Sequence, residues 1–259
     1  MTSPWVFLAL VACVFAAAFV QAVPQGRIVS GDEAIEGQFP YQISLRRENM
    51  HVCGGTIISA RYILTAVHCV AEVPKTGRYI LRKPEELTVQ AGSIDRTKGG
   101  VVVGVSEVTA HEHYGFNLND IAVIRLRDRL AFSKTIKAID FATQEPPVNA
   151  TVVVSGWGRL SDLGTRPDKL QYTNVRYMST TECARKTQIN GNQVLCMDHP
   201  LNRGPCKGDS GGPAAYQNKL VGINSFLIKG CGSEKPDMYV NVGTYLPWIR
   251  NHTDSAKER

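Results

Sequence analysis

Short β-prone segments separated by turn-forming residues recur along most of this 259-residue chain. Residues 41–45 alternate apolar and polar side chains. Further runs rich in apolar and β-branched residues occupy 56–58, 62–65, 101–103, 121–124, 151–154, 220–223 and 238–242. Evenly spaced short strands of this kind indicate a β-sandwich or a β-barrel, and periodicity does not distinguish the two. Residues 245–250 place apolar side chains at helical spacing, so the sequence predicts an all-β fold with a C-terminal α-helix.

One glycine-rich hexapeptide, Gly208-Asp209-Ser210-Gly211-Gly212-Pro213, has little propensity for helix or strand. Glycine lets a backbone adopt positive φ and approach a ligand closely. A serine hydroxyl held on such a turn, with free backbone N–H groups beside it, suits a nucleophile that attacks a carbonyl carbon. The alternative is a turn without catalytic meaning.

Two further motifs supply the groups that such a serine needs. His68 lies in Leu64-Thr65-Ala66-Val67-His68-Cys69, and Asp120 lies in Asn119-Asp120-Ile121-Ala122. A histidine titrates near neutrality and can take the serine proton, while a carboxylate behind it can fix the imidazole tautomer. Taken singly, His68 could be structural and Asp120 could cap a turn. With Ser210, the three motifs resemble the chymotrypsin-like serine protease family from Ile28 to about Arg250.

This resemblance implies a definite fold and definite roles. The fold is two six-stranded antiparallel β-barrels, residues 28–138 and 139–259, with the active site between them and the terminal helix packed on the second barrel. His68 would act as general base and acid, Asp120 would orient it, and Ser210 would form an acyl-enzyme. The backbone N–H groups of Gly208 and Ser210 would bind the oxyanion. The order His, Asp, Ser also differs from that of α/β-hydrolases and subtilisins.

The N-terminus predicts export. Residues 5–20 are almost wholly apolar and uncharged, and Val20-Gln21-Ala22 offers small residues at the usual cleavage spacing. This pattern indicates a secretory signal peptide over residues 1–22. A membrane anchor is the alternative, but a span needs roughly 20 apolar residues and this run is shorter. We therefore expect a secreted, extracellular protein without a membrane anchor.

The cysteines fit the same compartment. Cleavage after Ala22 removes Cys13 and leaves six of the seven cysteines, and an even number in a secreted chain implies disulfides. The spacing leaves many pairings open and contains no Cys-x-x-Cys pair that would suggest zinc. The family resemblance implies the pairs Cys53–Cys69, Cys183–Cys196 and Cys206–Cys231.

A second processing site follows the leader. Residues 23–27 end in Arg27 and precede Ile28-Val29-Ser30-Gly31, which resembles the activation junction of the family. Cleavage after Arg27 by a trypsin-like protease would create an ammonium on Ile28 that pairs with Asp209. Because an unpaired buried carboxylate is costly, we expect the uncut chain to hold Asp209 elsewhere and to leave the site unformed. The alternative is an ordinary loop that contains an arginine.

Three residues bear on substrate choice. Trypsin-like members carry Asp at the pocket floor, where this chain has Gly204, and the opposite wall should carry Asp237. This arrangement resembles crustacean collagenolytic members, which accept apolar and basic residues, unless Asp237 is a solvated loop residue. Leu227 stands where trypsin and chymotrypsin carry glycine, and it could narrow the entrance as in elastases. We predict a chymotrypsin- or collagenase-like broad endopeptidase, with elastase-like and trypsin-like specificity as alternatives.

Other features add little. The formal net charge of +6 comes without a long basic run, so a solvated surface is expected rather than nucleic-acid binding. Asn149 and Asn251 begin glycosylation sequons. His111 and His113 could share a strand face, but no third metal ligand is visible, and no acidic calcium loop follows Ser93. We expect no metal and no cofactor.

The expected partners are protein or peptide substrates, the activating protease and protein inhibitors, and the expected state is a monomer. A second class of function stays open, because some secreted relatives have lost catalysis and act as binding or regulatory proteins. Their usual lesion is a replaced triad residue, whereas His68, Asp120 and Ser210 are all present here.

Overall fold

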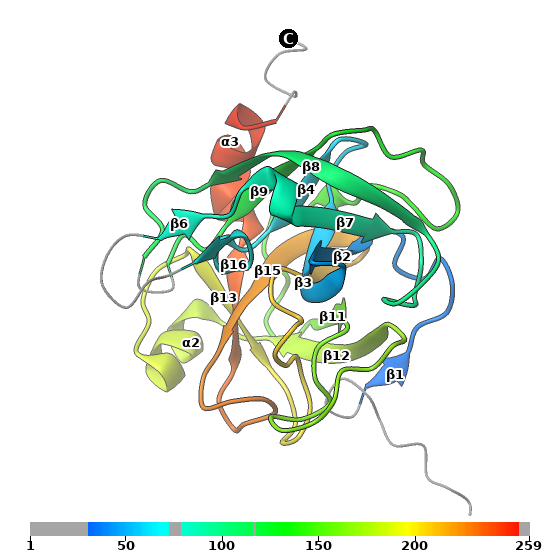
Figure 1. Ribbon diagram of the computed structural model, residues 1–259. Helices are drawn as coiled ribbons and strands as arrows, with labels where there is room; N and C mark the ends of the chain where they lie inside the picture. Colours follow the sequence, from blue (N-terminus) through cyan, green and yellow to red (C-terminus); the bar gives the residue numbers. More distant parts are fainter. Residues whose placement is uncertain (1–30, 73–78, 116–117, 254–259) are drawn as a thin grey trace, which may run out of the picture.

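The computed structural model describes residues 31–72, 79–115 and 118–253 of the chain. They form two largely antiparallel β-barrels that lie against each other, with a helix near the C-terminal end (Figure 1). The all-β prediction is confirmed, and barrels rather than a sandwich are observed. The leader, the activation peptide and the Arg27–Ile28 junction lie outside the described residues.

The first barrel closes six strands in the order β2-β3-β4-β9-β8-β7. Their bounds are β2 (Gln42–Arg47), β3 (Met50–Ile57), β4 (Tyr62–Thr65), β7 (Leu87–Ala91), β8 (Val101–Ala110) and β9 (Ala122–Leu126). The alternation seen at 41–45 has a physical basis, because Ile43 and Leu45 pack into the barrel core. Gln42, which precedes Ile43, accepts a hydrogen bond from Ser155 of the second barrel, Oγ to Oε1 at 2.7 Å.

The second barrel is a ring of six strands, closed where β12 pairs with β13. Its members are β11 (Thr151–Gly156), β12 (Gln171–Tyr177), β13 (Val194–Asp198), β14 (Pro213–Tyr216), β15 (Lys219–Leu227) and β16 (Asp237–Asn241). Two short strands extend this sheet, with β1 (Asp32–Glu33) pairing with β12 and β10 (Asp140–Phe141) pairing with β15. The start of the described chain therefore joins the second barrel, although its residues fall in the range expected for the first.

Short elements connect and cover the barrels. They are α1 (Val67–Val70), β5 (Ala71–Glu72), β6 (Ile80–Leu81), the 3-10 turn η1 (Pro84–Glu86), α2 (Thr180–Thr187) and α3 (Val242–Asn251). Helix α3 contains the predicted segment 245–250, but it does not pack on the second barrel alone. Tyr245 Oη donates to Asn119 Oδ1 at 2.8 Å, and Trp248 Nε1 donates to Glu112 Oε2 at 3.0 Å. The helix thus also contacts the first barrel, beside which Figure 1 shows it.

An apolar cluster joins the two barrels along their shared face. Leu64 and Ile121 of the first barrel pack there with Ile223 of the second and with Tyr245 and Ile249 of α3. The predicted triad residues lie next to strands of this junction: His68 follows β4, and Asp120 precedes β9. Burial of such side chains, at roughly 25 cal/mol per Å² of apolar surface, holds the two barrels in one orientation.

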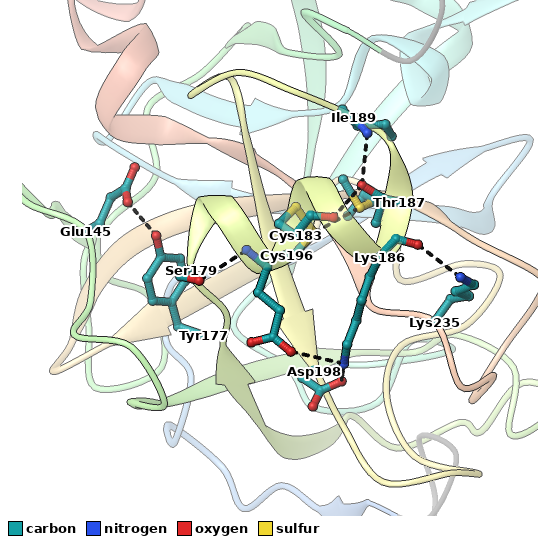
Figure 2. Close-up of a disulfide and its surroundings, with 12 residues drawn as sticks. Glu145, Tyr177, Ser179, Cys183, Lys186, Thr187, Ile189, Cys196, Asp198 and Lys235 are labelled. Carbon is teal, nitrogen blue, oxygen red and sulfur yellow. Dashed lines mark hydrogen bonds and ion pairs between the residues drawn. A yellow bond between two sulfur atoms is a disulfide. The ribbon is translucent and has the colours of Figure 1, made fainter.

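The structure contains the three disulfides that the family resemblance implied: Cys53–Cys69, Cys183–Cys196 and Cys206–Cys231. Figure 2 shows the second of these joining α2 to β13. The sequence analysis did not predict α2, whose first turn is capped by the Ser179 side chain accepting from the Glu182 N–H. Lys186 also pairs with Asp198 at 3.5 Å, which holds the end of β13 in place (Figure 2).

Candidate active site

His68 and Asp120 come together because their strands are neighbours. His68 lies in α1 directly after β4, Asp120 lies two residues before β9, and Thr65 of β4 pairs with Ala122 of β9. His68 Nδ1 is 2.7 Å from Asp120 Oδ2, and the His68 backbone N–H donates to Asp120 Oδ1 at 3.1 Å. The Cys53–Cys69 disulfide ties the turn that carries His68 to β3.

Asp120 is almost fully buried, with 2% of its surface exposed. Burial alone would raise the pKa of its carboxyl group, but hydrogen bonds from His68 and Ser225 outweigh burial and hold the pKa below its usual value. An ionised Asp120 accepts the Nδ1 proton of His68. That tautomer leaves Nε2 of the imidazole unprotonated, so it can accept a proton from a neighbouring hydroxyl.

The turn that carries Ser210 packs against the first barrel. The Ser210 carbonyl accepts from the Gly54 N–H of β3 at 2.8 Å. Gly211 adopts φ +77°, and a Cβ on it would lie 2.2 Å from Thr65 Oγ1, at the end of β4. Glycine is therefore required on this turn both by backbone conformation and by contact. The structure thus brings the Ser210 turn onto the strand that leads into His68.

Strand β15 connects this turn to Asp120. The Asn224 carbonyl accepts from the Gly211 N–H at 2.7 Å, and the Asn224 N–H donates to the Gly212 carbonyl at 2.9 Å. The next residue, Ser225, donates its hydroxyl to Asp120 Oδ2 at 2.5 Å. The sequence analysis did not single out Ser225 and missed this contact. A serine in an apolar strand carries no local signal of such a partner.

A buried histidine holds the carbonyl of Gly208. His51 Nε2 lies 3.0 Å from the Gly208 oxygen, and His51 Nδ1 lies 2.8 Å from Ser44 Oγ. Burial lowers the pKa of His51 to about 3, so the ring is neutral, with Nε2–H donating to the carbonyl and Nδ1 accepting from Ser44. Sequence analysis did not single out His51 or Ser44. Their contact fixes the backbone of the loop whose N–H groups were predicted to bind an oxyanion.

Asp209 is buried beneath the Ser210 turn, with 3% of its surface exposed. Its Oδ1 accepts from the Gly158 N–H at 2.7 Å, and its Oδ2 accepts from the Cys206 N–H at 2.8 Å. Burial raises the pKa of Asp209 to about 6, although these two donors act in the opposite direction. The expectation that the uncut chain holds Asp209 elsewhere is not met in this structure, because the carboxylate is buried here and accepts from two backbone N–H groups.

Asp237 is not the solvated loop residue that the sequence left open as an alternative, because its carboxylate is buried and has a buried partner. Its Oδ2 lies 2.9 Å from His199 Nε2, and each of the two side chains is 1% exposed. Burial lowers the pKa of His199, but the Asp237 carboxylate outweighs burial and raises it. Gly204 adopts φ +106°, and a Cβ on it would lie 2.8 Å from Asp237 Oδ2 and 2.9 Å from His199 Cδ2. The structure therefore brings Gly204 and Asp237 together and adds His199, which sequence reasoning missed.

Leu227 lies at the end of β15, directly opposite Asp237 of β16 in the antiparallel register, and it is partly exposed. Phe226 before it pairs with Met238 and is also partly exposed. The three residues predicted to form a specificity pocket, Gly204, Leu227 and Asp237, thus lie on strand ends and a loop of the second barrel that meet around Asp237.

Metal-ligating side chains gather at two places among the described residues. One group is Cys53, His68 and Cys69, and the other is Asp162, Cys206 and Cys231. All four cysteines are in disulfides and have no thiolate to offer a metal. His111, considered as one of a metal pair with His113, instead accepts the His113 backbone N–H on Nδ1 at 3.2 Å.

Comparison with known proteins places these residues in a family. A family model described as trypsin matches residues 28–249, which include every residue of the candidate site described in this section. This chain belongs to the trypsin family. As a family member it is a serine endopeptidase, a hydrolase that acts on protein substrates. Across the described part of this trypsin-family protein, the helices are too short or too polar to cross a membrane.

Individual relatives agree. Trypsin alpha of Drosophila melanogaster is 40% identical, and the match covers 89% of each chain. Serine protease SP24D of Anopheles gambiae is 39% identical over 86% of this chain and 80% of its own length. Among solved structures, mouse neuropsin, described as a serine protease expressed in the limbic system of the brain, superimposes with a TM-score of 0.75. That match has 27% identity and covers 86% of this trypsin-family chain and 98% of neuropsin.

Proposed function

We propose that this protein is a secreted serine endopeptidase that is made as a zymogen and cleaves with broad, chymotrypsin- or collagenase-like preference. The observation that carries the proposal is the bridge formed by Asn224 and Ser225. Asn224 holds the Ser210 turn, and Ser225 bonds to the Asp120 carboxylate that contacts His68. One strand of the second barrel therefore fixes two of the proposed catalytic residues relative to each other.

In the proposed mechanism, Ser210 Oγ attacks the carbonyl carbon of the scissile peptide bond while His68 Nε2 takes its proton. The N–H groups of Gly208 and Ser210 donate to the oxyanion, and Asp120 stabilises the imidazolium. His68 then protonates the leaving amine, the carbon–nitrogen bond breaks, and an acyl-enzyme remains on Ser210. Water, deprotonated by His68, attacks the ester carbon; the bond from that carbon to Ser210 Oγ then breaks, His68 returns the proton to Oγ, and the carboxylic acid product leaves.

Activation would act on Asp209. Signal peptidase would remove residues 1–22, and a trypsin-like protease would cut after Arg27 to release residues 23–27. The new ammonium of Ile28 would then pair with Asp209. The raised pKa of that buried carboxyl supports this step, because two N–H donors leave its charge incompletely compensated. Cleavage would supply the missing cation rather than draw Asp209 in from solvent.

Gly204 supports the proposed preference. A trypsin-like carboxylate cannot be placed there, because φ is +106° and a Cβ would meet Asp237 and His199. Leu227, opposite Asp237, would face the incoming side chain and limit its bulk. The pocket would therefore favour apolar residues over the strict Arg and Lys preference that its trypsin-named relatives suggest.

Labelling of Ser210 by an organophosphonate tests the catalytic and zymogen proposals together. We expect little label in chains that begin at Val23, full label after trypsin cleavage of the Arg27–Ile28 bond, and none in Ser210→Ala. Full label in the uncut chain would exclude the zymogen. A folded, correctly cut chain without label would instead favour a catalytically silent binding protein.

A peptide library that varies the residue before the scissile bond tests the specificity proposal. We expect cleavage after several apolar residues. Exclusive cleavage after Arg and Lys would show a trypsin-like pocket, and exclusive cleavage after small residues would show an elastase-like one.

A further inference from the structure

Two buried side chains of opposite type lie together beneath Gly204. His199 directly follows β13 and Asp237 begins β16, and these strands pair with Met197 opposite Asp237. The register brings His199 Nε2 to 2.9 Å from Asp237 Oδ2, with both side chains 1% exposed. The contact is therefore shielded from solvent rather than screened at the surface.

The hydrogen-bond partners determine the charge of this pair. His199 Nδ1 lies 3.0 Å from the Pro200 carbonyl oxygen, which can only accept, so Nδ1 carries a hydrogen. Nε2 lies 2.9 Å from a carboxylate oxygen without the alignment of a hydrogen bond, and because two unprotonated atoms would repel at this distance, one of them carries a proton. On nitrogen, that proton makes an imidazolium–carboxylate pair, and on oxygen it makes a neutral imidazole and a carboxylic acid. Both arrangements have zero net charge.

The backbone of Gly204 lies against the His199–Asp237 pair. A Cβ at this position would lie 2.8 Å from Asp237 Oδ2 and 2.9 Å from His199 Cδ2, so the pair occupies the space of a side chain. Because Gly204 is buried and its φ is +106°, no acidic side chain can stand there without displacing the pair. In the proposed specificity pocket, Asp237 is then the carboxylate that would face a substrate side chain, and His199 is already paired with it.

We propose that His199 is a specificity-determining residue. Because it pairs with the Asp237 carboxylate, that carboxylate does not attract cationic substrate side chains, and the pocket favours uncharged ones. The proposal rests on the proposed function, in which Gly204 and Asp237 line the specificity pocket, and it narrows the broad preference to uncharged residues. A lysine or arginine side chain that entered the pocket would lose its hydration and meet a pair without net charge. An apolar side chain loses no such hydration, so it is preferred.

The test compares kcat/KM for matched peptide substrates that carry Arg or Phe before the scissile bond. His199→Ala leaves Asp237 without its partner and opens space beside it, so we expect the Arg-to-Phe ratio to rise about 10- to 100-fold. His113→Ala, which removes an exposed histidine far from this pair in the sequence, should leave the ratio unchanged. Active-site titration of each variant normalises for the fraction of folded enzyme.

Two further variants keep the proposal falsifiable if His199→Ala folds poorly. Asp237→Asn in the parent should leave the Arg-to-Phe ratio within about 3-fold, because Asp237 attracts no cation there. The double variant His199→Ala/Asp237→Asn should lose the gain of His199→Ala. A 10-fold drop in the ratio for Asp237→Asn, or an unchanged ratio in folded His199→Ala, would overturn the role of His199.

These outcomes separate this inference from the proposed function. A parent enzyme that cleaves strictly after Arg and Lys would overturn the proposed preference. If the parent enzyme prefers apolar residues but its Arg-to-Phe ratio does not change in His199→Ala, the inference is wrong, whereas the proposed endopeptidase function still holds.

Discussion

Ser225 Oγ lies 2.5 Å from Asp120 Oδ2, across the junction between the two barrels. Asp120 belongs to the chain segment that enters β9 of the first barrel, and Ser225 belongs to β15 of the second. The same Asp120 oxygen lies 2.7 Å from His68 Nδ1. The orientation of His68 therefore depends on how the barrels dock, as well as on the short helix α1 that carries it.

Ser225→Ala should weaken catalysis through Asp120. A hydrogen bond to a charged group contributes about 1.5–3 kcal/mol, and we expect kcat to fall about 10-fold with little change in KM. Ser106→Ala, which removes an exposed hydroxyl that bonds to a carbonyl on β9, is the matched control. A loss in kcat no larger than that of Ser106→Ala would contradict the role of Ser225.

The same variant has a pH signature. The folded-state pKa of Asp120 lies below its usual value, so this group stabilises the fold above that usual pKa and loses the contribution as pH falls through the folded-state pKa. Without Ser225 the folded-state pKa should rise. The unfolding free energies of Ser225→Ala and the parent, measured by urea titration, should therefore differ at neutral pH and converge in acid.

Gly158→Ala should disrupt the Asp209 site. A Cβ on Gly158 would lie 2.2 Å from Asp209 Oδ2, so the carboxylate must move or the loop must open. Overpacking of this kind costs about 1–3 kcal/mol, and we expect lower thermal stability together with loss of Ser210 labelling in the cut enzyme. Gly115→Ala meets nothing within 4 Å and should change neither. Normal labelling of Gly158→Ala would show that the position of Asp209 is not needed.

Asp209 should make the stability of the uncut chain depend on pH. Its pKa is raised from 3.8 to about 6 by burial, so its protonated form is favoured in the fold. Stability is then fully present below pH 3.8 and falls as pH rises through about 6, by about 3 kcal/mol for two pKa units. Unfolding of Ser210→Ala, compared with Ser210→Ala/Asp209→Asn between about pH 4 and 8, measures this difference without self-digestion.

Cleavage after Arg27 should remove most of that dependence, because an ammonium beside Asp209 lowers the pKa of its carboxyl. If the difference in unfolding free energy between the two variants does not change with pH in the uncut chain, the proposed effect of burial on Asp209 is wrong. A slope that persists unchanged after cleavage would contradict the proposed pairing with Ile28.

Sequence patterns predicted much of the fold because they record local geometry. The alternation at 41–45 and the β-rich runs at 62–65 and 151–154 appear as β2, β4 and β11. Helix α2 was missed because its eight residues are mostly polar, and its attachment to β13 depends on the Cys183–Cys196 disulfide. The contacts of α3 with Glu112 and Asn119 were missed because helical spacing identifies an apolar face but not its partner.

The residues of the candidate site also divide into those that the sequence identified and those that only the structure shows. His68, Asp120 and Ser210 lie in short motifs whose residue types and order carry the chemistry, and so could be named from the sequence. Gly204 and Asp237 could be named as well, but the buried partner of Asp237 could not. His199 lies 38 residues before it and resembles any histidine in a loop.

The sequence by itself determined the strand pattern, the glycine-rich turn that carries Ser210, and the family. These depend on backbone preferences and on residue types at short spacing, which neighbouring residues express without the rest of the fold. The tertiary structure decided which buried polar groups meet: Ser225 with Asp120, His51 with Gly208, and His199 with Asp237. Each pair joins distant segments, and burial makes the partner decisive, because a buried polar group without a partner would be costly.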